Sequence, residues 1–438
     1  MEKIDINQLV PYERNARVHN PKQVTAIARS IKAFGFNNPV LVDEKNVVIA
    51  GHGRLAAAKQ LGLRQIPIVR LNHLSEKEKK AYIVADNRLA ERASWDDKLL
   101  KLELQELSVD ADFDLSLTGF TTPETDLLLY GSVGAAPEET YQEPPDILKR
   151  VQPGDVWALG RHKVICADSL KPSSFDALLG KEKADIVVTD VPYNVKINGH
   201  VCGNGRAKHP EFAMASGEMS ETEFLQFLKR SFQNMRNYSK DGSLHFSFID
   251  WAHVRVMLEA GNVVYDELKN ICVWAKDVGG MGSLYRSRHE MVCVFKYGSA
   301  PHCNNIELGK YGRNRTNVWE YPAVRMQSRL SKGDPLLHPT VKPIGLLADI
   351  LLDASQQGDI VLDPFGGSGS TLLAAERTGR TARVVELSPH YCDVILHRYE
   401  KAGGQDVKLI WRATNENSPK ETSTNTGSKK LFIRRRVR

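Results

Sequence analysis

Continuous apolar runs alternate with helical stretches along the second half of the chain, from Val151 to about Trp411. The run ADIVVTD, residues 184–190, is apolar at most positions, which is typical of a strand buried on both faces of a parallel sheet. The runs 359–365 (DIVLDPF) and 382–386 (ARVVE) have the same character. Because helical stretches separate these runs, the pattern predicts a parallel sheet that helices cover on both faces.

The first 110 or so residues form a second pattern of short β-branched runs and helical stretches. The strand-like runs are Pro39 to Val42, Val47 to Ala50 and Ile66 to Leu71. Two helix starts are marked by a serine three residues before an acid, at Ser75 with Glu78 and at Ser94 with Asp97. This pattern predicts a small, mixed α/β unit.

Two segments lack a sustained apolar period. Residues 119–145 are rich in Thr, Pro, Gly, Ala and Glu, and we interpret residues 113–150 as a linker. Residues 413–438 are polar until they end in KKLFIRRRVR. This last segment is either a disordered tail or a basic arm that contacts phosphates. The predicted domains are therefore 1–112 and 151–412.

Composition narrows the class of protein. A chain of 438 residues with 42% hydrophobic and 26% charged residues is typical of a globular protein with two or three compact units. No apolar run is long enough to span a bilayer, and the first residues lack the pattern of a secretory signal, so we expect a cytoplasmic protein without membrane partners. The six cysteines form no CxxC pair, and no metal site is predicted. A net charge of +6 permits nucleic-acid binding without indicating it.

The strand 184–190 ends in a string whose chemistry suits an amine substrate: Asp190, Val191, Pro192 and Tyr193. The lone pair of a nucleobase amine is delocalised into the ring, so the amine is a poor nucleophile. Acceptors aimed at its hydrogens, from Asp190 and a neighbouring backbone carbonyl, would stabilise the positive charge that develops on nitrogen. Tyr193 offers a flat face on which an extruded base could stack. Taken alone, the string is more typical of an ordinary turn.

The second strand, 359–365, runs into a glycine-rich turn and then a helix, which is a pattern that can hold a cofactor. Glycines let the backbone approach a ligand, and helix-start amides bind a carboxylate. Asp363 could receive an ammonium group, and Glu386, at the end of the next strand, has the position of an acid that binds ribose hydroxyls. Such turns also occur as structural corners.

These strings resemble the amino-methyltransferases of DNA. The family's (Asp/Asn/Ser)-Pro-Pro-(Tyr/Phe) string stands here as Asp190 to Tyr193, and its Phe-x-Gly-x-Gly loop stands as Phe365 to Gly369. The segment His338 to Pro343 is similar to the segment that closes over the cofactor, and Ala167 to Leu170 is similar to the family's Gly-Asp-Ser-Leu. The catalytic string precedes the cofactor loop by about 170 residues, as in the β group of the family.

The resemblance implies a Rossmann-like S-adenosylmethionine-dependent methyltransferase sheet, with residues 243–250, 271–276 and 289–296 as later strands. It implies that the cofactor is bound by Asp168, His338, Thr340, Lys342, Asp363, Phe365, Gly367, Gly369, Ser370, Thr371 and Glu386. Target recognition would fall within 194–220 and 297–337. The basic residues of these two segments are His200, Arg206, Lys208, His209, Arg313, Arg315, Arg325 and Arg329, which suit phosphate and guanine contacts or are ordinary solvated charges.

The family pattern is broken at one position. Val191 stands where the family usually has its first proline, so the turn loses one fixed φ but keeps its carbonyl. A cost of about 1 kcal/mol in preorganisation would slow catalysis without abolishing it. An inactive methyltransferase half is the extreme outcome.

Most of residues 1–110 resemble ParB and sulfiredoxin-like domains, which are small α+β units. The resemblance rests on residues 47–54 (VVIAGHGR) and the helical stretch that follows. It implies that Gly51, His52, Gly53 and Arg54 hold a nucleotide triphosphate or a DNA phosphate, although a purely structural turn is an equal reading. A phage or prophage origin is a further implication of this fusion.

We therefore predict a site-specific DNA methyltransferase that transfers a methyl group from S-adenosylmethionine to the exocyclic amine of adenine. Adenine is favoured because cytosine-specific members of the family more often carry serine where Asp190 stands. The alternatives are methylation of the cytosine amine, of RNA or of a protein glutamine, and a ParB-like DNA-binding protein without methyltransferase activity. The recognition sequence, a cognate restriction nuclease and the oligomeric state, with a homodimer as one possibility, are left open.

Overall fold

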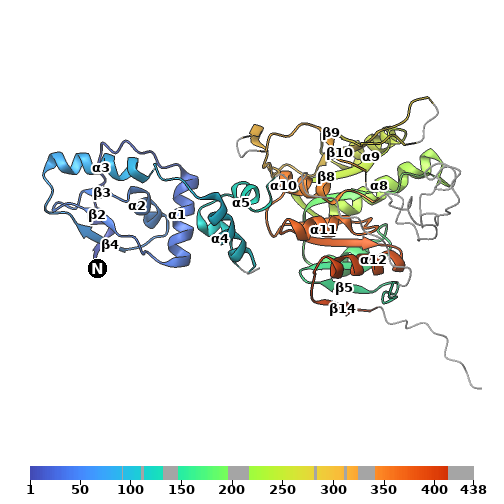
Figure 1. Cartoon of the computed structure of the whole chain (residues 1–438), viewed down its shortest axis with the longest axis horizontal. Helices are drawn as coiled ribbons and strands as arrows, with labels where there is room; N and C mark the ends of the chain where they lie inside the picture. The colour runs from blue at the N-terminus through green and yellow to red at the C-terminus, as the bar shows by residue number, and fades with distance from the viewer. Residues whose placement is uncertain are drawn as a thin grey trace, which may run out of the picture.

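The structure is a computed structural model, and it describes residues 1–90, 92–109, 113–131, 147–195, 217–280, 284–309, 313–323 and 341–412. Within these residues, no helix combines the length and the apolar character that crossing a membrane requires. The predicted tail 413–438 lies outside the described residues. A smaller α/β unit and a larger sheet with helices on both faces are joined by short helices (Figure 1).

The N-terminal unit is a four-stranded sheet with helices packed around it. Its strand order is β1-β4-β2-β3, and β2 runs parallel to β4 while the other pairs are antiparallel. The elements are β1 (Glu2–Asp5), η1 (Ile6–Gln8), α1 (Pro21–Phe34), β2 (Val40–Val42), β3 (Val48–Ala50), α2 (His52–Gln60), β4 (Gln65–Arg70) and α3 (Glu76–Ala90). The three strand-like runs predicted from the sequence are strands in the structure. Their buried side chains pack with those of β1 and α2 in one apolar core.

The two predicted helix starts differ in outcome. Ser75 caps α3 as expected, because its backbone N–H donates to Glu78 Oε2 at 2.8 Å while the Glu78 N–H donates to Ser75 Oγ at 3.4 Å. The next helix, α4 (Asp97–Val109), is capped by Asp96 and not by Ser94, since Asp96 Oδ1 accepts from the N–H groups of Lys98 and Leu99.

The segment expected to be a linker contains helical structure. It includes the 3-10 turn η2 (Leu115–Thr118) and the helix α5 (Thr122–Tyr130), which begins with a capping box between Thr121 and Glu124. Leu129 of α5 packs with residues of α4 and η2, and Tyr130 also packs against the core of the large sheet. The prediction of a linker is therefore wrong for residues 115–130, while residues 132–146 lie outside the described part of the chain.

The larger unit is built on a ten-stranded sheet whose central strands are parallel. The strand order is β11-β9-β10-β8-β7-β12-β13-β6-β5-β14. The strands are β5 (Val156–Leu159), β6 (His162–Cys166), β7 (Ala184–Asp190), β8 (Ser239–Ile249), β9 (Glu267–Ala275), β10 (His289–Lys296), β11 (Val318–Glu320), β12 (Ile360–Asp363), β13 (Thr381–Glu386) and β14 (Val407–Trp411). The expected strands at 243–250, 271–276 and 289–296 correspond to β8, β9 and β10 in this sheet.

Helices cover both faces of the large sheet, as the apolar pattern predicts. One face packs against α6 (Pro172–Leu179), α8 (Glu221–Asn237) and α9 (Val254–Val264). The other packs against α10 (Ile344–Ala354), α11 (Ser370–Arg377) and α12 (Pro389–Lys401). The central strands carry side chains into both cores: Ile186 and Val188 of β7 point to one, and Val187 points to the other. Both faces of this strand are therefore buried.

The order in which successive strands are added to the sheet changes sides between β7 and β12. From β7 the chain proceeds to β8 on one side, and from β12 it proceeds to β13 on the other side. β7 is parallel to β12, which is parallel to β13, so the carboxyl ends of these three strands share one edge. Ligands of open parallel sheets bind at this edge, at the point where the strand order reverses. This topology brings residues near 190 and residues near 363 together.

Candidate active site

Two strand ends that are far apart in the sequence touch at the carboxyl edge of the sheet. Thr189, near the end of β7, donates its hydroxyl hydrogen bond to Asp363 Oδ1 at the end of β12, at 2.9 Å. Tyr193 and Phe365, which follow these two strands, both pack against the core on the α8 side of the sheet. The two predicted strings are therefore neighbours in space, as a methyl transfer between them requires.

Asp190 is the centre of a compact polar network. The Tyr193 hydroxyl donates to Asp190 Oδ1 at 2.6 Å, and Lys342 Nζ donates to Asp190 Oδ2 at 2.5 Å. Burial raises the pKa of Asp190, and the negative charge of Glu290 raises it further, whereas Lys342 acts in the opposite direction. Lys342 was expected to bind the cofactor, but in the structure it lies against the carboxylate that we expect to receive the amine.

The network contains two further charged residues that the sequence patterns did not predict. Glu290 on β10 accepts from Lys342 at 3.1 Å and from the Tyr193 hydroxyl at 3.0 Å. Lys276, directly after β9, donates to Glu290 Oε1 at 2.6 Å. Burial by itself would raise the pKa of Glu290, but the ammonium groups of Lys342 and Lys276 outweigh it and hold this pKa at about 2.

The departure from the family pattern is a buried side chain. Val191 is 1% exposed and belongs to the core on the α8 side of the sheet. Its packing anchors the turn between Asp190 and Tyr193 by apolar contact, in a position where a proline would restrict φ.

The glycine turn after β12 packs tightly against the next strand. A Cβ added to Gly366 would lie 2.3 Å from Val384 Cγ1, and Gly369 has a φ of 85°. Other residues would therefore clash or be strained at these two positions. The first helical residues, Ser370 and Thr371, are buried beside the turn, and Arg398 donates to Ser370 Oγ at 3.3 Å.

Two buried acids flank the glycine turn. Glu386, at the end of β13, accepts from the Gly367 N–H at 2.7 Å and from the Ser388 N–H at 2.8 Å, and burial raises its pKa to about 7. Asp363 also accepts from the Phe365 N–H at 3.1 Å, and burial raises its pKa to about 6. An acid for an ammonium, an acid for ribose hydroxyls and a tight glycine turn that leads into a helix fit an amino-acid nucleoside cofactor such as S-adenosylmethionine.

The remaining expected cofactor residues are only partly described. Asp168 follows β6 and accepts from the Leu170 N–H at 2.9 Å, and the preceding Ala167 N–H donates to the Glu386 carbonyl. This places Asp168 beside the end of β13. His338 and Thr340 lie outside the described residues, so their role stays a prediction.

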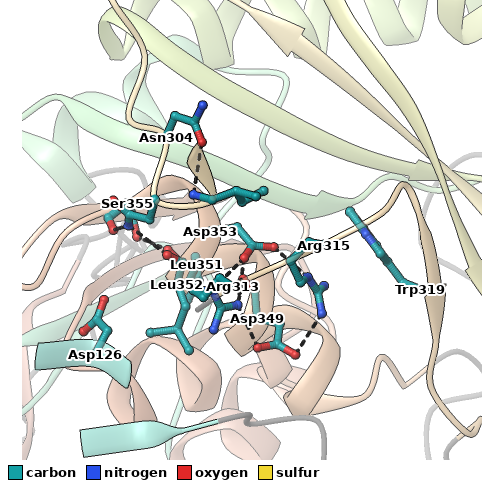
Figure 2. A network of polar contacts seen from close by, with 12 residues as sticks. Asp126, Asn304, Arg313, Arg315, Trp319, Asp349, Leu351, Leu352, Asp353 and Ser355 are labelled. Carbon is teal, nitrogen blue, oxygen red and sulfur yellow. Dashed lines mark hydrogen bonds and ion pairs between the residues drawn. The ribbon is translucent and has the colours of Figure 1, made fainter. Parts of the chain in front are cut away.

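Two arginines expected to contact DNA are engaged inside the protein. Arg313 Nε donates to Asp353 Oδ1 at 2.9 Å and Arg313 Nη2 donates to Asp349 Oδ1 at 3.0 Å, and Arg315 pairs with the same two aspartates of α10 (Figure 2). The side chain of Arg313 is 6% exposed. The hypothesis that these two arginines reach phosphates or bases is therefore wrong. The other predicted recognition residues, His200, Arg206, Lys208, His209, Arg325 and Arg329, lie outside the described residues.

The predicted phosphate-binding residues of the N-terminal unit line one cleft of roughly 170 Å³. Gly51 has a φ of 99° and immediately precedes α2, whose first residues are His52 and Gly53. Arg17 and Arg54 also line the cleft, and His52 Nε2 is buried without a hydrogen-bond partner. The phosphate ligand stays a prediction, which binding of a nucleoside triphosphate to the full chain would test.

The fold and the site together indicate an enzyme of the α/β class, with the carboxylate of Asp190 near a glycine turn that two buried acids flank. Comparison with protein families agrees with this class. Residues 184–397 match a DNA methylase model, residues 1–87 match the ParB N-terminal domain, and residues 98–153 match the ParB-methyltransferase HTH domain. Residues 184–397 are therefore a DNA methylase domain, and ParB-type domains precede it in the chain.

Individual proteins are similar to separate parts of the chain. The ParB-like nuclease domain-containing protein YnaK of Escherichia coli is 45% identical over 75 residues, which are 17% of this chain and 86% of that protein. The DNA adenine methyltransferase YhdJ of Escherichia coli is 41% identical over 86 residues, which are 20% of this chain and 28% of that protein. The crystal structure of the M1.HpyAVI–SAM complex has a TM-score of 0.39 and 18% identity, and the match covers 54% of this chain and 98% of that one.

The HTH match adds a domain that the sequence patterns did not suggest. It spans residues 98–153 and so includes nearly all of α4, η2, α5 and the whole of the segment that we interpreted as a linker. A capping box at Thr121 and Glu124 and a proline in the first turn of α5 are the signals that indicate a helix there.

Proposed function

We propose that this chain transfers a methyl group from S-adenosylmethionine to the exocyclic amine of adenine in DNA. The observation that carries the proposal is the contact between the ends of β7 and β12, where Thr189 binds Asp363 and Asp190 lies next in the chain. This contact brings the Asp190 carboxylate near the glycine turn and the two buried acids, which supports the proposal.

The cofactor supplies a methyl group on a positively charged sulfur. Asp190 accepts a hydrogen bond from the amine, and the carbonyl of Val191 accepts a second one, so that positive charge developing on nitrogen meets negative charge and a dipole. Tyr193, whose hydroxyl is held by Asp190 and Glu290, presents its ring for stacking on the extruded base. Glu386 would bind the ribose hydroxyls, Asp363 the ammonium group, and the amides at the start of α11 the carboxylate.

Two observations favour adenine over cytosine. The first position of the string is Asp190, whereas family members that act on cytosine more often carry serine there. In addition, 86 residues of the chain are 41% identical to YhdJ, a protein whose name specifies adenine. DNA is favoured over RNA or protein as the substrate because the chain combines a DNA methylase domain with ParB-type domains.

Transfer of labelled methyl groups tests the proposal directly. The full chain is incubated with methyl-labelled S-adenosylmethionine and unmethylated DNA, RNA or total protein, and the DNA is then digested to nucleosides for mass spectrometry. We expect label in DNA, on N6-methyladenine. Label on N4-methylcytosine would show that the target base is cytosine and not adenine. Label confined to RNA or protein, or no label despite DNA binding, would refute a DNA methyltransferase.

A further inference from the structure

A second carboxylate lies behind the predicted catalytic carboxylate and shares both of its side-chain partners. The Lys342 ammonium lies 2.5 Å from Asp190 Oδ2 and 3.1 Å from Glu290 Oε2. The Tyr193 hydroxyl lies 2.6 Å from Asp190 Oδ1 and 3.0 Å from the same Glu290 oxygen. Glu290 therefore contacts the two groups that determine where the Asp190 carboxylate points.

We propose that Glu290, supported by Lys276, is a positioning residue for methyl transfer: it holds Lys342 and Tyr193 so that the Asp190 carboxylate stays aimed at the amine. This inference rests on the proposed function, because it assigns a role within the same site. Glu290 acts through its neighbours and has no contact with substrate in this assignment.

The charges of the network explain why a second carboxylate is needed. Lys342 is 5% exposed and lies over the aromatic rings of Tyr193, Phe248 and Trp274. A single buried ammonium beside Asp190 would neutralise the acceptor and repel the positive charge that grows on the amine. Glu290 offsets part of the positive charge of the Lys342 ammonium, and Lys276 in turn offsets the negative charge of Glu290. Two carboxylates and two ammonium groups leave the network neutral.

Tyr193 provides the geometric part of the argument. Its hydroxyl has one hydrogen, which two carboxylate oxygens share, so the ring is held from both sides of its outer end. Without Glu290, the hydroxyl keeps only its bond to Asp190, and the ring gains freedom about that bond. A stacking face that rotates or shifts by about 1 Å can lower the rate roughly 100-fold.

The test compares the wild-type chain with Glu290→Gln in steady-state methylation of DNA over a range of pH. We expect kcat to fall by roughly 100-fold while the affinity for S-adenosylmethionine stays within about twofold, because Glu290 does not touch the cofactor corner. We also expect the acid limb of the kcat profile to move to lower pH. The charged and titratable groups that face Asp190 are Lys342, Glu290, Tyr193 and Asp363, and removing one negative charge from this set favours ionised Asp190.

Three further variants make the result decisive. Glu267→Gln, on the neighbouring strand β9, removes an exposed carboxylate that pairs with Lys269 at 2.9 Å, and it is expected to behave as wild type. Glu290→Asp keeps the charge and is expected to recover part of kcat. Lys276→Met keeps Glu290 and is expected to lower kcat less than Glu290→Gln, so it carries the test if Glu290→Gln does not fold.

The inference is overturned if Glu290→Gln keeps the wild-type kcat and acid limb, or if its kcat falls without any shift of the limb. In the absence of a folded Glu290→Gln, wild-type kinetics of Lys276→Met overturn it. If the wild-type chain itself methylates no DNA base, the proposed function fails, and that outcome is distinct from either of these.

Discussion

Burial governs the ionisation of the two carboxylates that we assign to the cofactor. It raises the pKa of Glu386 to about 7 and that of Asp363 to about 6, although two backbone N–H groups donate to Glu386. The ribose hydroxyls donate to the ionised form of Glu386. A chain with a protonated Glu386 must therefore release a proton when the cofactor binds.

We predict that the affinity for S-adenosylmethionine falls by up to about tenfold per pH unit between pH 7 and 6, and more steeply below 6, where Asp363 is also protonated. Isothermal titration calorimetry from pH 5 to 9 would measure this limb. Glu386→Gln should bind more weakly above pH 7 and lose the limb near 7, and retain one near 6 from Asp363. An affinity of the wild type that is independent of pH in this range would contradict the assignment of Glu386.

At the scale of elements, α5 joins the HTH-matched segment to the methylase sheet through a buried ion pair. Arg380, directly before β13, donates from Nη2 to Asp126 Oδ2 of α5 at 2.7 Å and from Nη1 to Asp126 Oδ1 at 3.1 Å. Arg380 also donates to the Ser355 carbonyl at 2.7 Å, and both members of the pair are at most 1% exposed. The contact lies at the amino end of β13, opposite the edge that carries the site.

We predict that Arg380→Met and Asp126→Leu each lower the free energy of unfolding by about 3–5 kcal/mol, because each leaves a buried charge without its partner. The double variant should lose less than the sum of the two, which a double-mutant cycle with chemical denaturation would measure. Glu400→Gln, which breaks the more exposed pair with Arg150, is the matched control and should cost about 1 kcal/mol or less. Additive losses in the cycle would show that the pair does not couple α5 to the sheet.

The elements with strong apolar runs could be predicted from the sequence, and those that depend on distant partners could not. β7, β12 and β13 are apolar because both of their faces are buried, so their position was evident. α5 was missed because its neighbourhood is rich in Thr, Pro and Gly, and because the partner of Asp126 is more than 250 residues away. Arg313 and Arg315 were misassigned because their partners lie on another element, 34–40 residues further along the chain. Two aspartates at 349 and 353 in an otherwise apolar helix are the signal that basic partners are buried nearby.

At the scale of the whole molecule, the site exists only because the sheet brings distant segments together. The strings at 190–193 and 363–369 each have a local signature, and the strand order places them side by side. Glu290 and Lys276 have no such signature. They meet because antiparallel pairing of β10 with β9 sets Glu290 opposite Trp274. Lys276 lies two residues after Trp274, so its side chain is on the same face of the sheet. Sequence patterns therefore located the two strings that meet at the edge of the sheet and missed the charges beside Asp190.

The central claim is that the corner at Asp190 performs the chemistry while the corner at Glu386 holds the cofactor. Its most direct test is a measurement on Asp190→Ala of both S-adenosylmethionine affinity and single-turnover methyl transfer to DNA. The account predicts cofactor affinity close to that of the wild type and a transfer rate lower by about 10²–10³-fold, since an acceptor needed in the transition state is gone. Wild-type methyl transfer by Asp190→Ala would contradict the account.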